Sequence, residues 1–185
     1  MDLQALADRL EIIEVCTRLH WCVDHRDWDG LDDLLADQVS FPTPAELSAP
    51  DFDPARYRRS RAEVKAAYPG LLKGLITQHL IAGHQVELDG DRAVCRAHSI
   101  NVHLPENSEN SENAENAENA ENAENADKPE LILHGNEYRF ELARTATGWR
   151  IDGRQTWIRW RWGDETHYDV DRRLLQWSGQ VRPAT

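Results

Sequence analysis

Three ionisable side chains that lie far apart in the sequence, Asp24, His79 and His103, could together move a proton. Histidine exchanges protons near neutral pH, and a carboxylate bonded to one ring nitrogen fixes the tautomer and raises the basicity of the other. In a dry pocket such a group could remove a proton next to a carbonyl and protonate a departing hydroxyl. We expect Asp24 to orient His103 as the base, and His79 to donate the proton.

Four further side chains could contact a substrate in the same pocket. His20 lies one helical turn before Asp24, and Asn136 and Tyr138 share one face of a predicted strand, where either could bind a substrate oxygen. Trp149 could form part of the pocket wall, although a large ring in this position is more often part of the core.

The remaining histidines are less suited to this site. His98 is an alternative to His103 as the second catalytic histidine, but strand alternation places it on the opposite face. The same alternation separates His84 from the pocket, which favours a structural role. His25 and His167 are expected at the surface.

Each proposed catalytic residue also has a purely structural interpretation. Asp24 could cap the end of a helix, His79 could be a core histidine bonded to the backbone, and His103 could lie at an exposed strand end. Two histidines and an aspartate could also form a facial triad for iron, but no local metal-type spacing supports this. We therefore expect neither a metal nor a cofactor.

A helix over residues 3–27 should carry the first of these side chains. One predicted stripe begins apolar and ends polar: Leu6, Leu10, Ile13, Thr17, His20 and Asp24. The neighbouring stripe is apolar throughout: Ile12, Cys16, Leu19 and Val23. This helix should therefore be well buried, with its polar end at a cavity.

Shorter elements should follow this helix. We expect a short helix over residues 31–35, a proline-rich loop over 41–58, and a third helix over 60–68. Glu63 follows Ser60 at the spacing of a capping box, which marks the start of that third helix.

Four strands are predicted in the second half of the chain, over residues 75–88, 92–104, 131–143 and 149–162, with a possible helix over 171–177. The first strand should present His79, Ile81 and Gly83 on one face. The second should present Ala93, Cys95, Ala97, Ser99, Asn101 and His103. The third should present Ile132, His134, Asn136, Tyr138, Phe140 and Leu142.

A low-complexity Glu-Asn-Ala/Ser repeat occupies residues 106–127. It has no hydrophobic period and repels itself, so we expect a surface loop between two strands. An acidic interaction tail or a flap over the pocket is the alternative. Its seven glutamates account for more than half of the formal net charge of −12, a sign that argues against a nucleic-acid partner.

The length of 185 residues favours a single domain, 1–185. No apolar run reaches the length of a membrane span and no signal peptide precedes the first helix, so we expect a cytoplasmic protein. The three cysteines have no metal-type spacing and should be reduced.

The order of helices followed by long strands is typical of an α+β domain. Residues 24–29, 77–83 and 149–160 resemble the three signature stretches of scytalone dehydratase, and the chain more broadly resembles the SnoaL-like polyketide cyclases and dehydratases of the nuclear-transport-factor-two-like superfamily. The resemblance implies a cone-shaped, curved mixed or antiparallel sheet with N-terminal helices packed on its concave face, enclosing a deep pocket.

The resemblance also implies site residues. The dehydratase uses an Asp and two His without a metal, and these match Asp24, His79 and His103; an Asn that contacts substrate falls near Asn136 or Tyr138. Two tyrosines of the dehydratase are missing here, because Val23 replaces one and residues 41–43 contain none. This departure argues against scytalone itself as the substrate.

The sequence thus predicts a metal-free acid–base lyase or cyclase that dehydrates or cyclises an oxygenated cyclic, polyketide-like small metabolite. Alternatives are an isomerase or epoxide-opening cyclase on the same fold, and a noncatalytic ligand-binding or assembly subunit. A homo-oligomer, trimer or dimer, is expected, with no nucleic-acid or membrane partner.

Overall fold

The computed structural model describes residues 2–106 and 131–163. Most of the predicted repeat loop, the possible helix at 171–177 and His167 lie outside the described residues, and the prediction of a single domain over 1–185 stays a prediction.

A six-stranded mixed sheet organises the described chain, in the order β2-β1-β6-β5-β4-β3. Its strands are β1 Leu35–Ser40, β2 Arg58–Ser60, β3 Leu75–Asp89, β4 Arg92–Pro105, β5 Ile132–Thr145 and β6 Gly148–Trp162. Neighbouring strands are antiparallel, except that β1 runs parallel to β6. The helices are α1 Leu3–Asp24, α2 Pro44–Leu47 and α3 Arg61–Leu71. This α+β arrangement confirms the predicted fold class.

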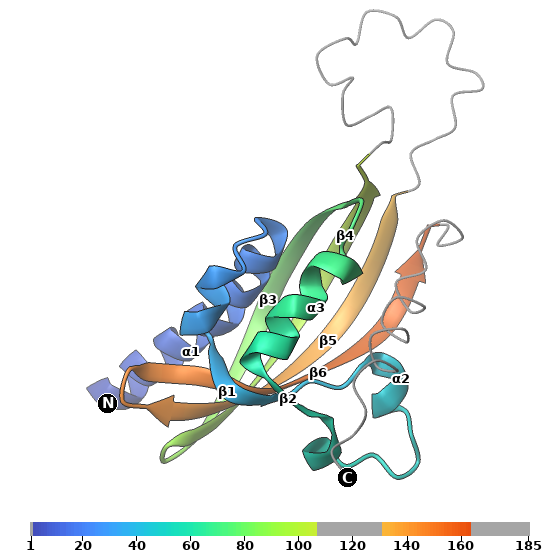
Figure 1. Cartoon of the computed structure of the whole chain (residues 1–185). Coiled ribbons are helices and arrows are strands. Elements are labelled where there is room, and N and C mark those ends of the chain that lie inside the picture. Colours follow the sequence, from blue (N-terminus) through green and yellow to red (C-terminus); the bar gives the residue numbers. More distant parts are fainter. Residues whose placement is uncertain (1, 107–130, 164–185) are drawn as a thin grey trace, which may run out of the picture.

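The helices α1 and α3 lie over the same face of the sheet (Figure 1). The apolar stripe of α1 is buried as predicted, and Tyr68 and Leu71 of α3 are buried with it. The other predicted stripe is wrong over its first half, because Leu6 and Leu10 are exposed. His20 and Asp24 reach the interior because they flank the buried stripe at the end of α1.

Strand alternation predicted the inner faces of β4 and β5 correctly. Every member of both rows is buried: Ala93, Cys95, Ala97, Ser99, Asn101 and His103 on β4, and Ile132, His134, Asn136, Tyr138, Phe140 and Leu142 on β5. The rows are adjacent, since Asn101 pairs with His134 and Ser99 with Asn136. The polar members of the two rows, Ser99, Asn101 and His103 on β4 and His134 and Asn136 on β5, lie side by side.

A β-bulge interrupts the alternation of β3. The pairing with β4 shifts between Ala82 and Gln85, and Gly83 has a φ of 69°, a left-handed conformation that favours glycine. The residues of β3 that face the core therefore have odd numbers before the bulge and even numbers after it. Ile81 and Val86 accordingly both pack against the core. The expected inward row His79, Ile81, Gly83 thus holds only as far as Ile81.

The short strands β1 and β2, the helix α2 and two 3₁₀ helices were not predicted. Residues 31–35 were expected to be helical, but a 3₁₀ helix ends at Asp33 and β1 begins at Leu35. The expected loop over 41–58 contains α2, a second 3₁₀ helix at Pro54–Tyr57 and the start of β2. Such short segments carry too little alternation to be recognised as strands.

The capping box of α3 is present as predicted. The Ser60 hydroxyl accepts the backbone N–H of Glu63 at 3.2 Å, and the Glu63 carboxylate accepts the backbone N–H of Ser60 at 2.7 Å. The helix continues to Leu71, beyond its predicted end at Tyr68, with Pro69 in its final turn. Within the described ranges, no helix has the length and apolar character needed to cross a membrane.

We predict that Ser60→Ala destabilises the protein by about 1 kcal/mol, because an N-cap hydroxyl satisfies a backbone donor that alanine leaves unpaired. Ser60→Asp should retain nearly full stability, since aspartate is an equally good cap. Urea unfolding of the three proteins measures the difference, and equal loss in both variants would contradict a capping role.

Candidate active site

A cavity of about 110 Å³ lies between the helices and the sheet. Its wall combines apolar side chains from α1 and α3 with polar ones from β3, β4, β5 and β6. The lining residues are Leu19, His20, Val23, Phe41, Pro42, Thr43, Tyr68, Leu71, Leu72, His79, Asn101, His103, His134, Asn136, Tyr138, Arg154, Thr156 and Ile158.

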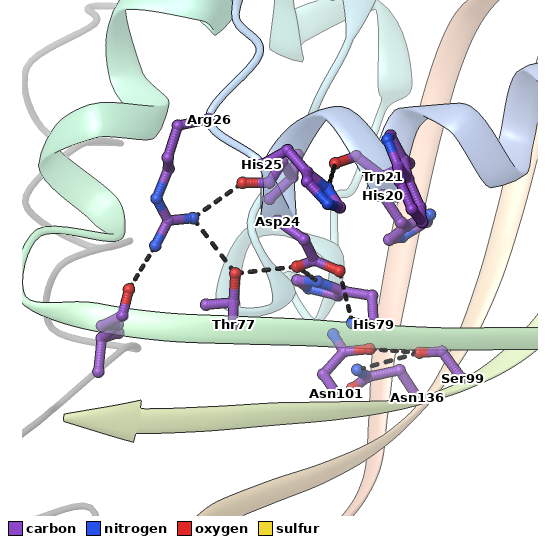
Figure 2. Close-up of polar contacts among 12 residues, drawn as sticks. His20, Trp21, Asp24, His25, Arg26, Thr77, His79, Ser99, Asn101 and Asn136 are labelled. Atoms are coloured by element: carbon purple, nitrogen blue, oxygen red, sulfur yellow. Dashed lines mark hydrogen bonds and ion pairs between the residues drawn. The ribbon is translucent and has the colours of Figure 1, made fainter. Parts of the chain in front are cut away.

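The closest polar contact of the site joins Asp24 to His79 (Figure 2). The Asp24 carboxylate lies 2.6 Å from Nδ1 of His79 and accepts the backbone N–H of the same residue at 2.8 Å. It also accepts the Thr77 hydroxyl at 2.9 Å. His79 lines the cavity, whereas Asp24 lies behind it.

These contacts define the state of the His79 ring. A carboxylate can only accept, so Nδ1 of the neutral ring carries the hydrogen and Nε2 carries the lone pair. Burial opposes ionisation of Asp24, but the hydrogen bonds from His79 and Thr77 outweigh it, so the pKa of Asp24 lies below its ordinary value of 3.8. Asp24 is therefore a carboxylate at neutral pH, and it holds the neutral form of the His79 ring with Nε2 as the acceptor.

The end of α1 is fixed to β3 by a second set of contacts. Arg26 has a φ of 57°, the one non-glycine residue of the described chain with a left-handed backbone. Its guanidinium donates to the backbone carbonyl of Val23 at 2.8 Å, to the Thr77 hydroxyl at 3.2 Å, and to the carbonyl of Leu75. The turn after α1 thereby holds Asp24 against β3.

The structure changes the expected partner of Asp24. His103 was predicted to donate a hydrogen bond to Asp24, but His79 donates it. His103 does not lie directly across from His79. Its cross-strand partner on β3 is Thr77, two residues before His79. The rings of His79 and His103 lie edge to face, with centroids 6.0 Å apart.

His103 is a buried, neutral member of the cavity wall. Only 4% of it is exposed, and no described group hydrogen-bonds its Nδ1. Burial, assisted by the neighbouring rings of His79 and His134, lowers its pKa to about 3. At neutral pH His103 can therefore donate a hydrogen bond or accept one, but it is not a cation.

His20 lines the cavity beside His79. Its Nδ1 lies 3.1 Å from the carbonyl oxygen of Cys16, which requires Nδ1 to be the donor. Its ring centroid is 5.2 Å from that of His79 and 4.8 Å from that of Tyr138. Burial holds the pKa of His20 well below its ordinary value, so it too is neutral.

A hydrogen-bonded group of neutral polar residues covers the floor of the cavity. Ser99 donates to the amide oxygen of Asn101 at 2.7 Å, and Asn101 donates to the Tyr138 hydroxyl at 3.0 Å. The amide of Asn136 lies 3.5 Å from the Ser99 hydroxyl, and no described group bonds its buried Oδ1. Both predicted oxygen-binding residues, Asn136 and Tyr138, thus line the cavity.

Other predicted positions lie outside the cavity. Trp149 was a candidate for substrate contact, but it is fully buried in the core and its indole N–H lies 3.3 Å from Asp8. His98 is exposed on the opposite face of β4 from His103, and His25 is exposed at the end of α1. Of the two alternatives, His103 lines the cavity and His98 does not.

Sequence analysis did not assign a site role to Asn101, His134 or Arg154. The first two lie in the predicted inward rows, on the same faces as His103 and Asn136, so that alternation could have indicated them. Arg154 gave no such signal, because no inner face was assigned to residues 149–162.

The described residues offer no group of three His, Cys, Asp or Glu side chains arranged to hold a metal ion. The cavity histidines contact one another through ring edges and faces: the centroids of His103 and His134 are 5.1 Å apart.

Comparison with known families gives one match, in which the model of the SnoaL-like domain covers residues 4–155. No curated protein matches the chain in sequence.

Solved structures share the fold at low sequence identity. The Kfla4162 protein from Kribbella flavida has a TM-score of 0.67 and 23% identity over 91% of this chain and 98% of that one. A candidate scytalone dehydratase from Novosphingobium aromaticivorans has a TM-score of 0.61 and 14% identity over 89% and 92%. A hexachlorocyclohexane dehydrochlorinase (LinA) has a TM-score of 0.63 and 13% identity over 89% and 93%.

The depressed pKa of His103 predicts a loss of stability in mild acid. Between about pH 6 and 4.5 the unfolded chain protonates this histidine while the folded chain does not, so unfolding takes up a proton. The free energy of unfolding should therefore fall by about 1.4 kcal/mol per pH unit from this residue alone. Urea unfolding of wild type and His103→Gln across this range should show a flatter slope in the variant.

His98→Gln is the matched control, because it removes an exposed histidine from the same strand. Its slope should equal that of wild type. A His103→Gln slope as steep as that of wild type would contradict a neutral, buried His103.

Proposed function

The chain belongs to the SnoaL-like domain family, and on that premise we propose that it is an acid–base lyase or cyclase for an oxygenated cyclic, polyketide-like small molecule. The reaction we favour is dehydration of a β-hydroxy ketone. The proposal assigns no metal or cofactor to the reaction.

One observation carries this proposal: the Asp24 carboxylate holds Nδ1 of His79 at 2.6 Å, and the His79 ring lines the cavity. This arrangement leaves Nε2 as a base. It also reverses the roles expected from the sequence, because His79 rather than His103 is the oriented base. The carboxylate behind the ring stabilises the imidazolium that forms when Nε2 takes a proton.

Dehydration can proceed with His79 as both base and acid. Its Nε2 takes the proton from the carbon next to the substrate carbonyl, and the C–H electron pair forms an enolate. The enolate then expels the β-hydroxyl as the C–O bond breaks, and the Nε2–H of the imidazolium protonates it to water. The ring returns to its starting state, so each turnover gives one enone and one water.

Neutral donors can stabilise the enolate oxygen in this scheme. His103 is neutral above about pH 3, and Asn136 and Tyr138 line the same cavity. Hydrogen bonds from such preorganised donors are stronger in a site shielded from water. We assign the oxygen-binding role to these side chains, with His20 as a neutral contact beside the base.

The residues of the cavity wall help to decide between possible substrates, and between a catalytic and a noncatalytic function. Val23, Phe41, Pro42 and Thr43 line the cavity where scytalone dehydratase is expected to have tyrosines, which argues for a substrate other than scytalone. A ligand-binding or assembly subunit would not require a base oriented into an open cavity. Isomerisation would share the first proton transfer and differ only in where the proton returns.

The outer face of the sheet supports the expectation of a homo-oligomer, trimer or dimer. Exposed apolar side chains lie on this face, opposite to the cavity, among them Ile76, Leu80, Ile100 and Trp160. Leu80 pairs with Ile100 across β3 and β4, so part of this surface is continuous.

Wild-type protein should convert 3-hydroxy-1-tetralone to 1-naphthol, or 3-hydroxycyclohexanone to cyclohexenone, measured by product absorbance. His79→Gln and Asp24→Asn should each lower kcat/KM by about 10²- to 10⁴-fold, because the first removes the base and the second removes the charge that orients it. His103→Gln should cause a smaller loss.

His98→Gln again serves as the control and should turn over at the wild-type rate. Full activity in His79→Gln would exclude His79 as the base. Saturable binding of both ketones without turnover, or without exchange of their α-hydrogens in deuterium oxide, would favour the ligand-binding alternative.

A further inference from the structure

Arg154 places a permanent positive charge in the wall of the cavity. It comes from β6, whereas His79 comes from β3, and the strands β4 and β5 lie between them. At about 4.8 Å per strand, the strands β3 and β6 are about 14 Å apart. The two side chains therefore line the cavity from two strands at its opposite sides.

The surroundings of Arg154 are aromatic rather than acidic. Its guanidinium carbon lies 4.8 Å from the centroid of the Phe41 ring and 5.0 Å from that of Tyr138. No carboxylate of the described chain forms an ion pair with it, and no described group bonds its buried Nε. Cation–π contacts partly stabilise the charge but leave the planar N–H donors without an anionic acceptor.

Two other arginines are paired with buried or partly buried acids. Arg59, 3% exposed, lies 3.3 Å from the Glu46 carboxylate, and the half-buried Arg144 donates to the buried Asp8 at 2.8 Å. Burying a guanidinium without a counter-ion is costly, and such a cost is usually met by a partner. Arg154 differs from these two arginines because it faces a cavity instead of a carboxylate.

The rest of the described cavity wall does not neutralise this charge. Burial lowers the pKa values of His20 and His103, so both are neutral at pH 7. The Asp24 carboxylate does not line the cavity, and its oxygens accept hydrogen bonds from His79 and Thr77. An anionic ligand would therefore meet a guanidinium that no carboxylate of the described cavity wall neutralises.

We propose that the substrate carries an anionic oxygen group, a carboxylate, which Arg154 binds while the reacting carbon lies at His79. The rings of Tyr138 and His20 lie between these two ends, with centroids 4.8 Å apart, and would pack against a ring of the substrate. The position of the reacting end rests on the proposed function. The preference for a carboxylate is a binding property and can be measured without turnover.

Isothermal titration with two matched pairs tests the proposal: benzoate against benzamide, and 2-naphthoate against 2-naphthamide. Wild type should bind the carboxylate of at least one pair about tenfold or more tightly than its amide, as expected for charge-assisted hydrogen bonds. Arg154→Gln should lose that preference while its affinity for the amide stays within about twofold. Arg154→Lys should keep part of it.

Arg159→Gln is the matched control, because Arg159 is an exposed residue of the same strand paired with Glu137, and its preference should equal that of wild type. Equal wild-type affinity for acid and amide, no saturable binding of either carboxylate, or an unchanged preference in Arg154→Gln would each overturn the proposal. The comparison of carboxylate and amide affinity in wild type can overturn the proposal even if the Arg154 variants fail to fold.

His79→Gln separates this inference from the proposed function. It should retain the carboxylate preference although it loses the base. If wild type prefers the carboxylates over the amides but turns over no ketone, only the catalytic proposal fails. If it turns over neutral ketones but shows no preference for the carboxylates, only the role of Arg154 fails.

Discussion

The site depends on the attachment of the end of α1 to β3 through Asp24. One carboxylate accepts hydrogen bonds from the His79 ring, the His79 backbone and the Thr77 hydroxyl. These bonds fix both the height of the helix on the sheet and the tautomer of the histidine. Arg26 strengthens the same junction through two backbone carbonyls and Thr77, at the cost of a left-handed backbone. The contacts that attach α1 to β3 are therefore the same contacts that orient the His79 ring.

Different charged groups lie near the two ends of the cavity. Near β3, the Asp24 carboxylate accepts a hydrogen bond from His79, while burial lowers the pKa values of His20 and His103 and keeps both rings neutral. Near β6, Arg154 stays charged between aromatic rings. A substrate with a ring between an anionic group and an acidic C–H would satisfy both ends. The neutral residues between them, among them Asn101 and Tyr138, can then bind oxygen without disturbing either charge.

The features that could be predicted from the sequence are those that local periodicity determines. Alternation placed the inward rows of β4 and β5, including His103 and Asn136, and the capping box marked the start of α3. It did not predict that Asp24 pairs with His79, because that depends on where a helix end docks along a strand. The bulge at Gly83 and the short strand β1 also escaped it. Their positions are set by tertiary contacts rather than by a repeating pattern.

Asp24 is placed to hold the neutral His79 ring with Nδ1 protonated and Nε2 free to accept a proton. Long-range ¹H–¹⁵N NMR of the histidine rings measures this directly, with His79 assigned by its absence from the spectrum of His79→Gln. At a pH where the ring is neutral, we expect a protonated Nδ1 and a bare Nε2. Asp24→Asn should weaken this preference. A neutral His79 protonated at Nε2 in the wild-type protein would contradict this role of Asp24.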